Sequence, residues 1–456
     1  MCEALSHPQN AVVAFSMLRA PHWLMSISRR GPVLGRIVVF ACTVGLLAAC
    51  TPGGTSPTSS PNSQATTPSS DAGVAVPQSS DPVKADAIME IVRDYMEEAH
   101  LKAVILRVTV DGEEIVTAAE GESMTGVPAT TDMHFRNGAV AISYVSTLLL
   151  QLVDEKKMRL DDKLSMYLPD LPHADEVTIQ QLAQMTSGYQ DFVLGNDEFA
   201  QIAYADVFKA WTTEEQLALA IDKPLWYEPG TNWDYAHTNY VILGLVLEEV
   251  TGQSLEDALQ ERVLDPLGLD ETTASLTAEI PEPALHAYSS ERRSFFGIPA
   301  GTPFYEDSTS WNPSWTISQG AIETSDIYDL HDSAIAIGTG ELLSEESYAA
   351  MTSTDLRGKT TAIEGCINCR PLDDFATYGL GLWITGDWLL QNPLFYGYAA
   401  VNGYLPSVKI AIAVAVTYEE EAFNSEGQYS NGGDDLFRKI GAYLAPDDAP
   451  PVRPAP

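Results

Sequence analysis

Positively charged residues are scarce in this sequence of 456 residues. Lysine and arginine together contribute 25 side chains and aspartate and glutamate contribute 63, so the formal net charge is −38. A chain this acidic repels nucleic-acid phosphates and anionic lipid headgroups, which argues against nucleic acid as a partner. A hydrophobic fraction of 45% and a charged fraction of 19% exclude a fully disordered chain.

The apolar run at the N-terminus is short. Residues 37–49 form a run of 13 residues, fewer than the roughly 20 that a membrane-spanning helix needs. A basic segment with Arg29 and Arg36 precedes the run, which is typical of a secretory signal. The run ends in LAAC, which resembles a bacterial lipobox, so we expect lipid on Cys50. The sequence predicts an exported lipoprotein anchored to the outer face of the cell membrane; an ordinary signal peptide with a chance cysteine is the alternative.

Cysteine is also rare, with five residues in the chain. Two lie in the signal segment and Cys50 would carry lipid, which leaves Cys366 and Cys369. In an oxidising compartment this pair predicts a local disulfide. A redox role would need a thioredoxin-like βαβ setting and a zinc site would need two further ligands, and the sequence indicates neither. We therefore predict a disulfide and no metal.

Composition divides the chain into four parts. Residues 1–49 are predicted to be the signal peptide, and the Ser/Thr/Pro-rich segment 50–84 a flexible tether. Residues 85–445 form one globular domain with a helical insert at about 139–350. The proline-rich tail 446–456 is predicted to be disordered.

Local patterns predict the elements at both ends of this domain. Residues 85–100 have apolar side chains at helical spacing, and 103–121 contain two β-rich runs around Asp111-Gly112, a hairpin signal. Residues 409–416 predict a buried strand and 434–444 a terminal helix.

Short motifs follow one another through the globular segment. They are Phe135-Arg136-Asn137-Gly138, Leu160-Asp161-Asp162-Lys163-Leu164, Met185-Thr186-Ser187-Gly188, Pro229-Gly230-Thr231, Tyr235-Ala236-His237-Thr238-Asn239-Tyr240 and Asp265-Pro266-Leu267-Gly268-Leu269. In this order they resemble the landmarks of the serine β-lactamase and D-alanyl-D-alanine carboxypeptidase superfamily, in its class C and esterase-like branch. The resemblance implies an α/β fold, with a β-lactamase-like antiparallel sheet flanked by helices and an all-α subdomain.

The resemblance also implies acyl transfer through a Ser-x-x-Lys pair, in which the lysine takes the proton of the attacking serine. At those two positions this chain has Ala139 and Ile142. None of its ten lysines has a serine three residues before it, so the pair occurs nowhere in the sequence.

Two further motif positions depart from the family pattern. The Tyr-x-Asn motif keeps Tyr235 but has His237 in place of asparagine. A late Lys/His-x-Gly motif would fall on Gln391, Asn392 and Pro393, which provide neither lysine nor histidine. Without the serine and lysine, Tyr235 is interpreted as a buried aromatic residue and His237 as a hydrogen-bonded structural imidazole, although an imidazole also suits proton transfer.

No other nucleophile has a base at the required spacing. Ser143 is followed three residues later by Ser146, which is not a base. Ser187 matches a turn whose role, as the resemblance implies, is structural. Gly-x-Ser-x-Gly, His-Glu-x-x-His and phosphate-binding glycine loops are absent, and we predict no cofactor.

The sequence therefore predicts a catalytically inactive, serine-hydrolase-like domain of the cell envelope that binds a peptidoglycan peptide or an envelope protein. An active D-alanyl-D-alanine carboxypeptidase, β-lactamase or esterase with a non-standard site is the alternative. A purely structural or adhesive lipoprotein is a third hypothesis.

Overall fold

The computed structural model describes residues 76–452, except residue 276 and the segment 319–322. The predictions for the signal peptide, for Cys50 and for the tether up to residue 75 lie outside the described residues. Within the described part, no helix is at once long enough and apolar enough to cross a bilayer.

The domain begins with a helix and a hairpin, as the sequence predicts. Helix α2 (Pro82–Ala99) leads into β1 (Leu101–Val110), which pairs with β2 (Glu113–Met124). Asp111 and Gly112 form the turn with φ values of 50° and 81°, the left-handed conformation that a tight two-residue hairpin loop requires. The Asp111-Gly112 signal therefore predicted the turn correctly.

The main sheet is antiparallel throughout and has the strand order β3-β2-β1-β14-β13-β11-β10-β9, with β12 also paired to β13. Its other strands are β3 (Val127–Pro128), β9 (Thr377–Tyr378), β10 (Trp383–Thr385), β11 (Trp388–Gln391), β12 (Leu394–Phe395), β13 (Tyr398–Leu405) and β14 (Ile410–Tyr418). The predicted antiparallel sheet is confirmed, as is the buried strand at 409–416.

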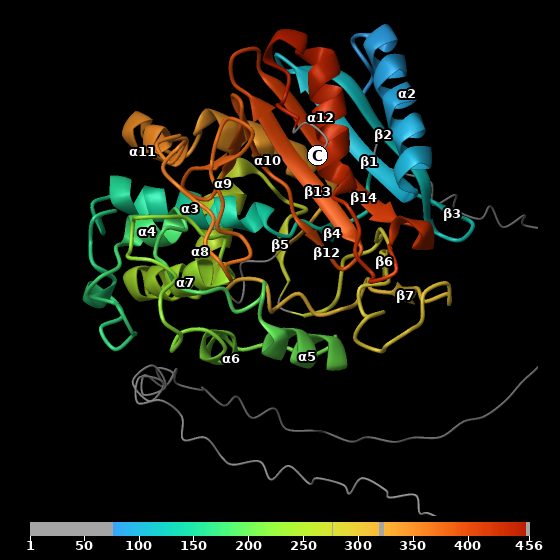
Figure 1. Ribbon diagram of the computed structural model, residues 1–456. Coiled ribbons are helices and arrows are strands. Elements are labelled where there is room, and N and C mark those ends of the chain that lie inside the picture. The colour runs from blue at the N-terminus through green and yellow to red at the C-terminus, as the bar shows by residue number, and fades with distance from the viewer. Residues whose placement is uncertain (1–75, 276, 319–322, 453–456) are drawn as a thin grey trace, which may run out of the picture. The chain divides into compact units, whose positions relative to one another are not determined.

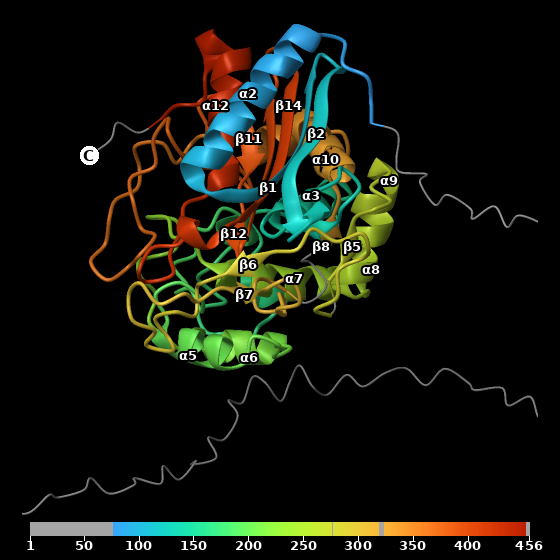
Figure 2. The same cartoon turned by 90° about the vertical axis from the view of Figure 1, so that its right-hand side faces the viewer.

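Helices cover both faces of this sheet. The larger side chains of β14, such as Ile412 and Val414, share a core with α2 and with α12 (Gly432–Leu444), which lie together over one face in Figures 1 and 2. Its alanines, such as Ala413, alternate with them and so lie on the opposite face, against which α10 (Ile327–Thr339) packs. Because side chains alternate along β14, its larger residues pack against α2 and α12 on one face of the sheet, and its alanines face α10 on the other.

A second region, rich in helices, lies beside the sheet in both views (Figures 1 and 2). Its helices are α3 (Val140–Asp154), α4 (Ile179–Ala183), α5 (Asp197–Ala205), α6 (Thr213–Ala218), α7 (His237–Thr251), α8 (Leu255–Leu259), α9 (Asp265–Leu267) and α11 (Glu345–Met351). A π-helical turn, Gln260–Leu264, joins α8 to α9.

The expected all-α character of this region is wrong between residues 268 and 326. That segment contains short strands and loops: β8 (Glu323–Ser325) pairs with β4 (Phe135–Arg136) and β5 (Thr273–Ala274), and β6 (Tyr288–Ser289) pairs with β7 (Glu306–Asp307). Prolines recur through the segment, and each one removes a backbone donor that a helix would need.

The ordered domain extends beyond both predicted boundaries. Ser80, assigned to the tether, bonds to the backbone carbonyl of Glu114 at 2.8 Å. The predicted tail is also in contact with the domain through residue 451, because Trp388 donates to the carbonyl of Asp448 at 2.8 Å and Arg438 donates to that of Pro451 at 2.6 Å. The prediction of disorder from residue 446 is wrong for this part of the tail, because tertiary contacts outweigh its proline-rich composition.

Candidate functional site

A cavity of about 480 Å³ opens between the start of α3, the start of α7 and the segment around β12. Five of the six positions singled out by the sequence line it: Ala139, Ile142, Tyr235, His237 and Pro393. The sixth, Gln391, is fully buried outside the cavity and donates to the carbonyl of Gly381 at 2.6 Å. The structure therefore brings the motif positions into one cleft, apart from Gln391.

The start of α3 carries no reactive side chain. Ala139 is the N-cap, and Ile142 is 1% exposed at the cavity wall. Gly138 has a φ of 53°, and a Cβ there would lie 2.6 Å from Pro393, so only glycine lets β12 and its preceding residue pack this closely. The cleft is therefore built around a helix start that lacks both a nucleophile and an amine.

Ser143 and Ser187, the other serines considered as nucleophiles, lie outside the cavity. Ser143 is 0% exposed, and its hydroxyl donates to the carbonyl of Val140 at 2.6 Å. Ser187 is also buried and donates to the side chain of Asn239. Neither lines the cavity, so neither hydroxyl faces a ligand bound there.

Tyr235 belongs to an aromatic shelf along the cleft. Its ring stacks on Trp383 at 6.0 Å with an angle of 8°, and it meets Tyr378 edge-on at 6.1 Å. Burial, and then the negative charge of Asp191, raise the pKa of the Tyr235 hydroxyl well above its ordinary value. Tyr235 is partly buried, as the structural interpretation expected, but it also presents a protonated phenol rather than a phenolate base to the cavity.

His237 is held by a carboxylate that sequence reasoning missed. Its Nδ1 lies 3.0 Å from Asp191 Oδ2, and the side chain of Asp191 is 3% exposed. The same carboxylate accepts the backbone N–H groups of Val193, Leu194 and His237, each at 3.1 Å. His237 is thus hydrogen-bonded, as the structural interpretation predicts, while its ring also lines the cavity.

The predicted Cys366–Cys369 disulfide is present. The two residues on either side of Cys369, Asn368 and Arg370, line the cavity. Between the two cysteines, Asn368 donates to the backbone carbonyl of Tyr235 at 3.0 Å. Just after them, the guanidinium of Arg370 lies over the ring of Trp383 at 5.1 Å. The disulfide therefore positions two polar residues of the cleft.

Asp234 lies beside this disulfide. One of its carboxylate oxygens and the two sulfur atoms lie within 4.8 Å of one another. In the structure the sulfurs are bonded to each other, so they are not thiolate ligands for a metal. Burial, and then the charge of Asp191, raise the pKa of Asp234 to about 7.

The charge of the cleft differs from that of the whole chain. Among the described residues that line it there is no aspartate or glutamate, and Arg370 supplies a positive charge. Its remaining walls are largely apolar or aromatic, with Trp315, Leu394 and Phe395 among them. In a chain of net charge −38, the walls of this cleft are therefore largely apolar and carry no negatively charged side chain among the described residues.

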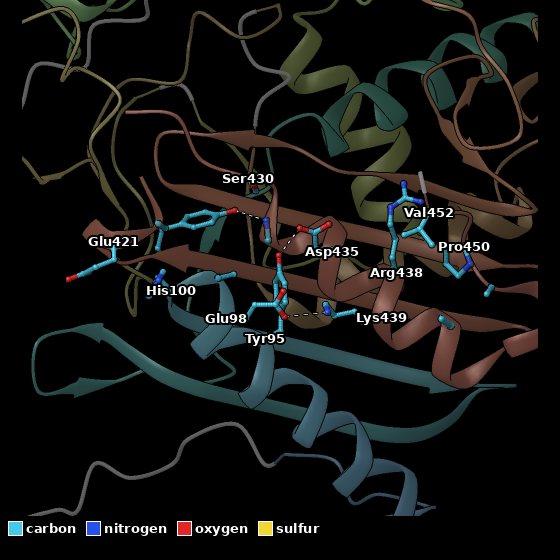
Figure 3. A pocket seen from close by; sticks show the side chains of 16 residues that line it. Tyr95, Glu98, His100, Glu421, Ser430, Asp435, Arg438, Lys439, Pro450 and Val452 are labelled. Carbon is cyan, nitrogen blue, oxygen red and sulfur yellow. Dashed lines mark hydrogen bonds and ion pairs between the residues drawn. The ribbon is translucent and has the colours of Figure 1, made fainter. Parts of the chain in front are cut away.

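Figure 3 shows a second cavity, of about 670 Å³, between the end of α2 and α12. Tyr95 donates to Asp435 at 2.6 Å, and Lys439 pairs with Glu98 at 3.5 Å. Because these polar groups already pair with one another, they stabilise the contact between the two helices, and we assign no site to them.

Comparison with known proteins identifies the family. The Beta-lactamase family model matches residues 88–437. The chain belongs to this family. Penicillin-binding protein 4 of Amycolatopsis lactamdurans is 39% identical over 202 residues, which cover 41% of this chain and 47% of that protein. The putative penicillin-binding protein PbpX of Bacillus subtilis is 24% identical over 299 residues, 65% of each chain.

The match to these curated relatives spans about half to two thirds of their length. A solved structure extends the likeness of the fold: the D-amino acid amidase of Ochrobactrum anthropi superposes with a TM-score of 0.66 at 22% identity, covering 80% of this chain and 99% of the amidase. At this identity the superposition shows a shared fold and carries no statement about activity. The chain is a β-lactamase-related, serine-hydrolase-like domain.

Proposed function

We propose that this protein is an exported lipoprotein whose β-lactamase-like cleft binds a cell-wall peptide or an envelope protein without forming an acyl-enzyme. The observation that carries the proposal is the open cavity with Ala139 and Ile142 in its wall. A volume of about 480 Å³ lies within the range of ligand pockets. The site has thus kept its space while lacking the attacking atom.

The chemistry of the walls supports a peptide ligand. The shelf formed by Tyr235 and Trp383 offers flat apolar area, and Arg370 offers a positive charge for a carboxylate or a carbonyl group. The relatives named penicillin-binding proteins support a ligand from the cell wall. A peptide end with one apolar side chain suits this combination.

Filling the cleft with a larger side chain tests whether the ligand binds there. We expect Ala139→Phe to reduce the affinity for purified peptidoglycan peptides at least about tenfold, because a phenyl ring would occupy the ligand's space. Val408→Phe places the same ring on the exposed turn between β13 and β14 and is the matched control. Titration calorimetry with both variants measures the difference, and equal affinities would contradict binding in this cleft.

The alternative is an active hydrolase that uses a non-standard site. The pairing of His237 with Asp191 favours it, because an imidazole oriented by a carboxylate is a common general base. A base alone does not replace the covalent step, so this candidate requires direct attack by water. Ester hydrolysis that is lost in His237→Gln would support it over the binding proposal.

Anchoring gives a separate prediction. We expect the mature protein to partition into the detergent phase and to carry diacylglycerol on Cys50, because two acyl chains provide stable membrane attachment. Cys50→Ser should release the protein into the aqueous phase. Phase partitioning of both forms measures this, and equal membrane association would show that Cys50 is not the anchor.

A further inference from the structure

The loop closed by the disulfide brings a buried carboxyl group close to both sulfur atoms. One carboxylate oxygen of Asp234 and the sulfurs of Cys366 and Cys369 lie within 4.8 Å of one another. Among the residues that the structure describes, this is the single group of three histidine, cysteine, aspartate or glutamate side chains whose ligand atoms approach so closely. Asp234, Cys366 and Cys369 are 3%, 7% and 5% exposed, so the group lies inside the protein.

The folded chain supplies no hydrogen-bond donor for the carboxyl group of Asp234. Within the described part of the chain, no N–H or O–H group donates to its oxygen atoms. A buried carboxyl group in this position is costly, because its lost hydration is not replaced. Asp234 does not line the cleft either, so a ligand of the cleft does not account for it. The two sulfurs are the groups beside it with which it can share a ligand.

The backbone of the loop already has an arrangement that stabilises a thiolate. The N–H of Cys369 donates to Sγ of Cys366 at 3.2 Å, and a hydrogen bond of this kind is stronger when the sulfur is anionic. The N–H of Cys366 in turn bonds to the carbonyl of Ile363 at 3.2 Å. These bonds belong to the turn itself, so we expect the turn to remain when the disulfide is reduced. With Cα atoms 5.4 Å apart, the two sulfurs can then separate by side-chain rotation.

We propose that Cys366, Cys369 and Asp234 bind a zinc ion when the disulfide is reduced, with the fourth position left to water. Two sulfur ligands and one oxygen favour zinc over magnesium or calcium, which prefer oxygen alone. Zinc–sulfur bonds of about 2.3 Å place the sulfurs of a tetrahedral site about 3.8 Å apart, which fits the spacing of the three ligand atoms. The three ligands are anionic when they bind, and a dication supplies the opposite charge that a buried group of anions needs.

Loading the site takes two balanced steps. A water-soluble phosphine first reduces the disulfide: the phosphorus takes the oxygen atom of a water molecule, and the two hydrogen atoms of that water end on the sulfurs as thiols. Zinc then replaces both thiol protons, which leave to solvent, and the carboxylate of Asp234 binds beside the two thiolates. Because protons compete with zinc for the sulfurs, we expect binding to weaken as the pH falls.

Cobalt and zinc titrations of the full-length protein test the site. After reduction and removal of the phosphine under argon, cobalt should give a thiolate-to-metal charge-transfer band that zinc abolishes by displacement. The disulfide form should not give the band, and Cys366→Ser, which keeps the other cysteines of the chain, should lose it. Asp234→Asn should lower the zinc affinity at least about tenfold, because it removes a ligand. Glu364→Gln removes an exposed negative charge from the same loop and is the matched control, with unchanged affinity expected.

Thermal unfolding shows whether the metal binds to the folded chain. Zinc should raise the Tm of the reduced protein more than that of the disulfide form, because a ligand that binds the native state stabilises it. The absence of the cobalt–thiolate band after reduction, or a band without this rise in Tm, would overturn the proposal. Equal zinc affinities of Asp234→Asn and the unaltered protein would also overturn it, since the carboxylate would then not be a ligand.

Discussion

Hydrolysis of β-lactams and of D-alanyl-D-alanine peptides by the unaltered protein is expected to stay at background. In serine hydrolases, loss of the nucleophile or its base lowers turnover by about 10⁶-fold, which corresponds to about 8 kcal/mol of transition-state stabilisation. Here Ala139 and Ile142 occupy both positions at once, and Ser143 is buried and bonded to its own helix. Initial rates with a chromogenic cephalosporin measure this, and a rate proportional to protein concentration that disappears in His237→Gln would contradict it.

The double variant Ala139→Ser/Ile142→Lys is the companion experiment. We expect it to remain without turnover, because His237 and Pro393 still depart from the family pattern in the same cleft. Slow acylation of the introduced serine would be compatible with this, since Tyr235 persists at the cavity wall. Ala139→Ser alone is the control, because it supplies the attacking atom without the base. Full activity of the double variant would show that His237 and Pro393 do not prevent turnover.

A large effect on stability is expected at Asp234. Because burial and Asp191 raise its pKa from 3.8 to about 7, the native state holds a proton in this range that the unfolded state releases. Stability therefore falls as the pH rises from about 4 to 7, and the loss is complete above pH 7. A rise of this pKa from 3.8 to about 7 corresponds to a destabilisation of the folded state of up to about 4 kcal/mol at pH 8.

Asp234→Asn removes this charge and should be more stable than the unaltered protein at pH 8 by up to about 4 kcal/mol, and equal to it near pH 4. Urea unfolding at both pH values measures the difference. Burial also raises the pKa of Glu291 to about 7. Because Glu291 is present in both proteins, its effect on the pH dependence of stability is the same in each and does not change the difference between them. A stability difference that is the same at both pH values would contradict the assignment to Asp234.

Elements with strong local signals were predictable from the sequence. The hairpin at Asp111-Gly112 and the helices at both ends of the domain follow from turn chemistry and apolar spacing, which act over a few residues. The tail was not predictable, because its order depends on contacts such as that of Trp388 with Asp448, which are 60 residues apart. Composition alone carries no information about such contacts.

The same distinction applies to the cleft. Motif order was sufficient to bring Ala139, Ile142, Tyr235 and His237 together, because the family fold fixes their places. Asp191 has no motif of its own: it lies 46 residues before His237, and only the folded chain brings its carboxylate to the ring. The expected position of the Lys/His-x-Gly motif placed Gln391 in the site, but in the structure its side chain donates to the carbonyl of Gly381 instead.

The most direct test of the account is covalent labelling of the unaltered protein. Fluorescent penicillin and fluorophosphonate probes both report a serine able to form an acyl- or phosphonyl-enzyme, whatever its place in the sequence. We expect no stoichiometric adduct with either probe in the folded protein. An adduct that peptide mapping assigns to one serine, with Ser143 the first to inspect, and that disappears when this serine is replaced by alanine, would contradict it.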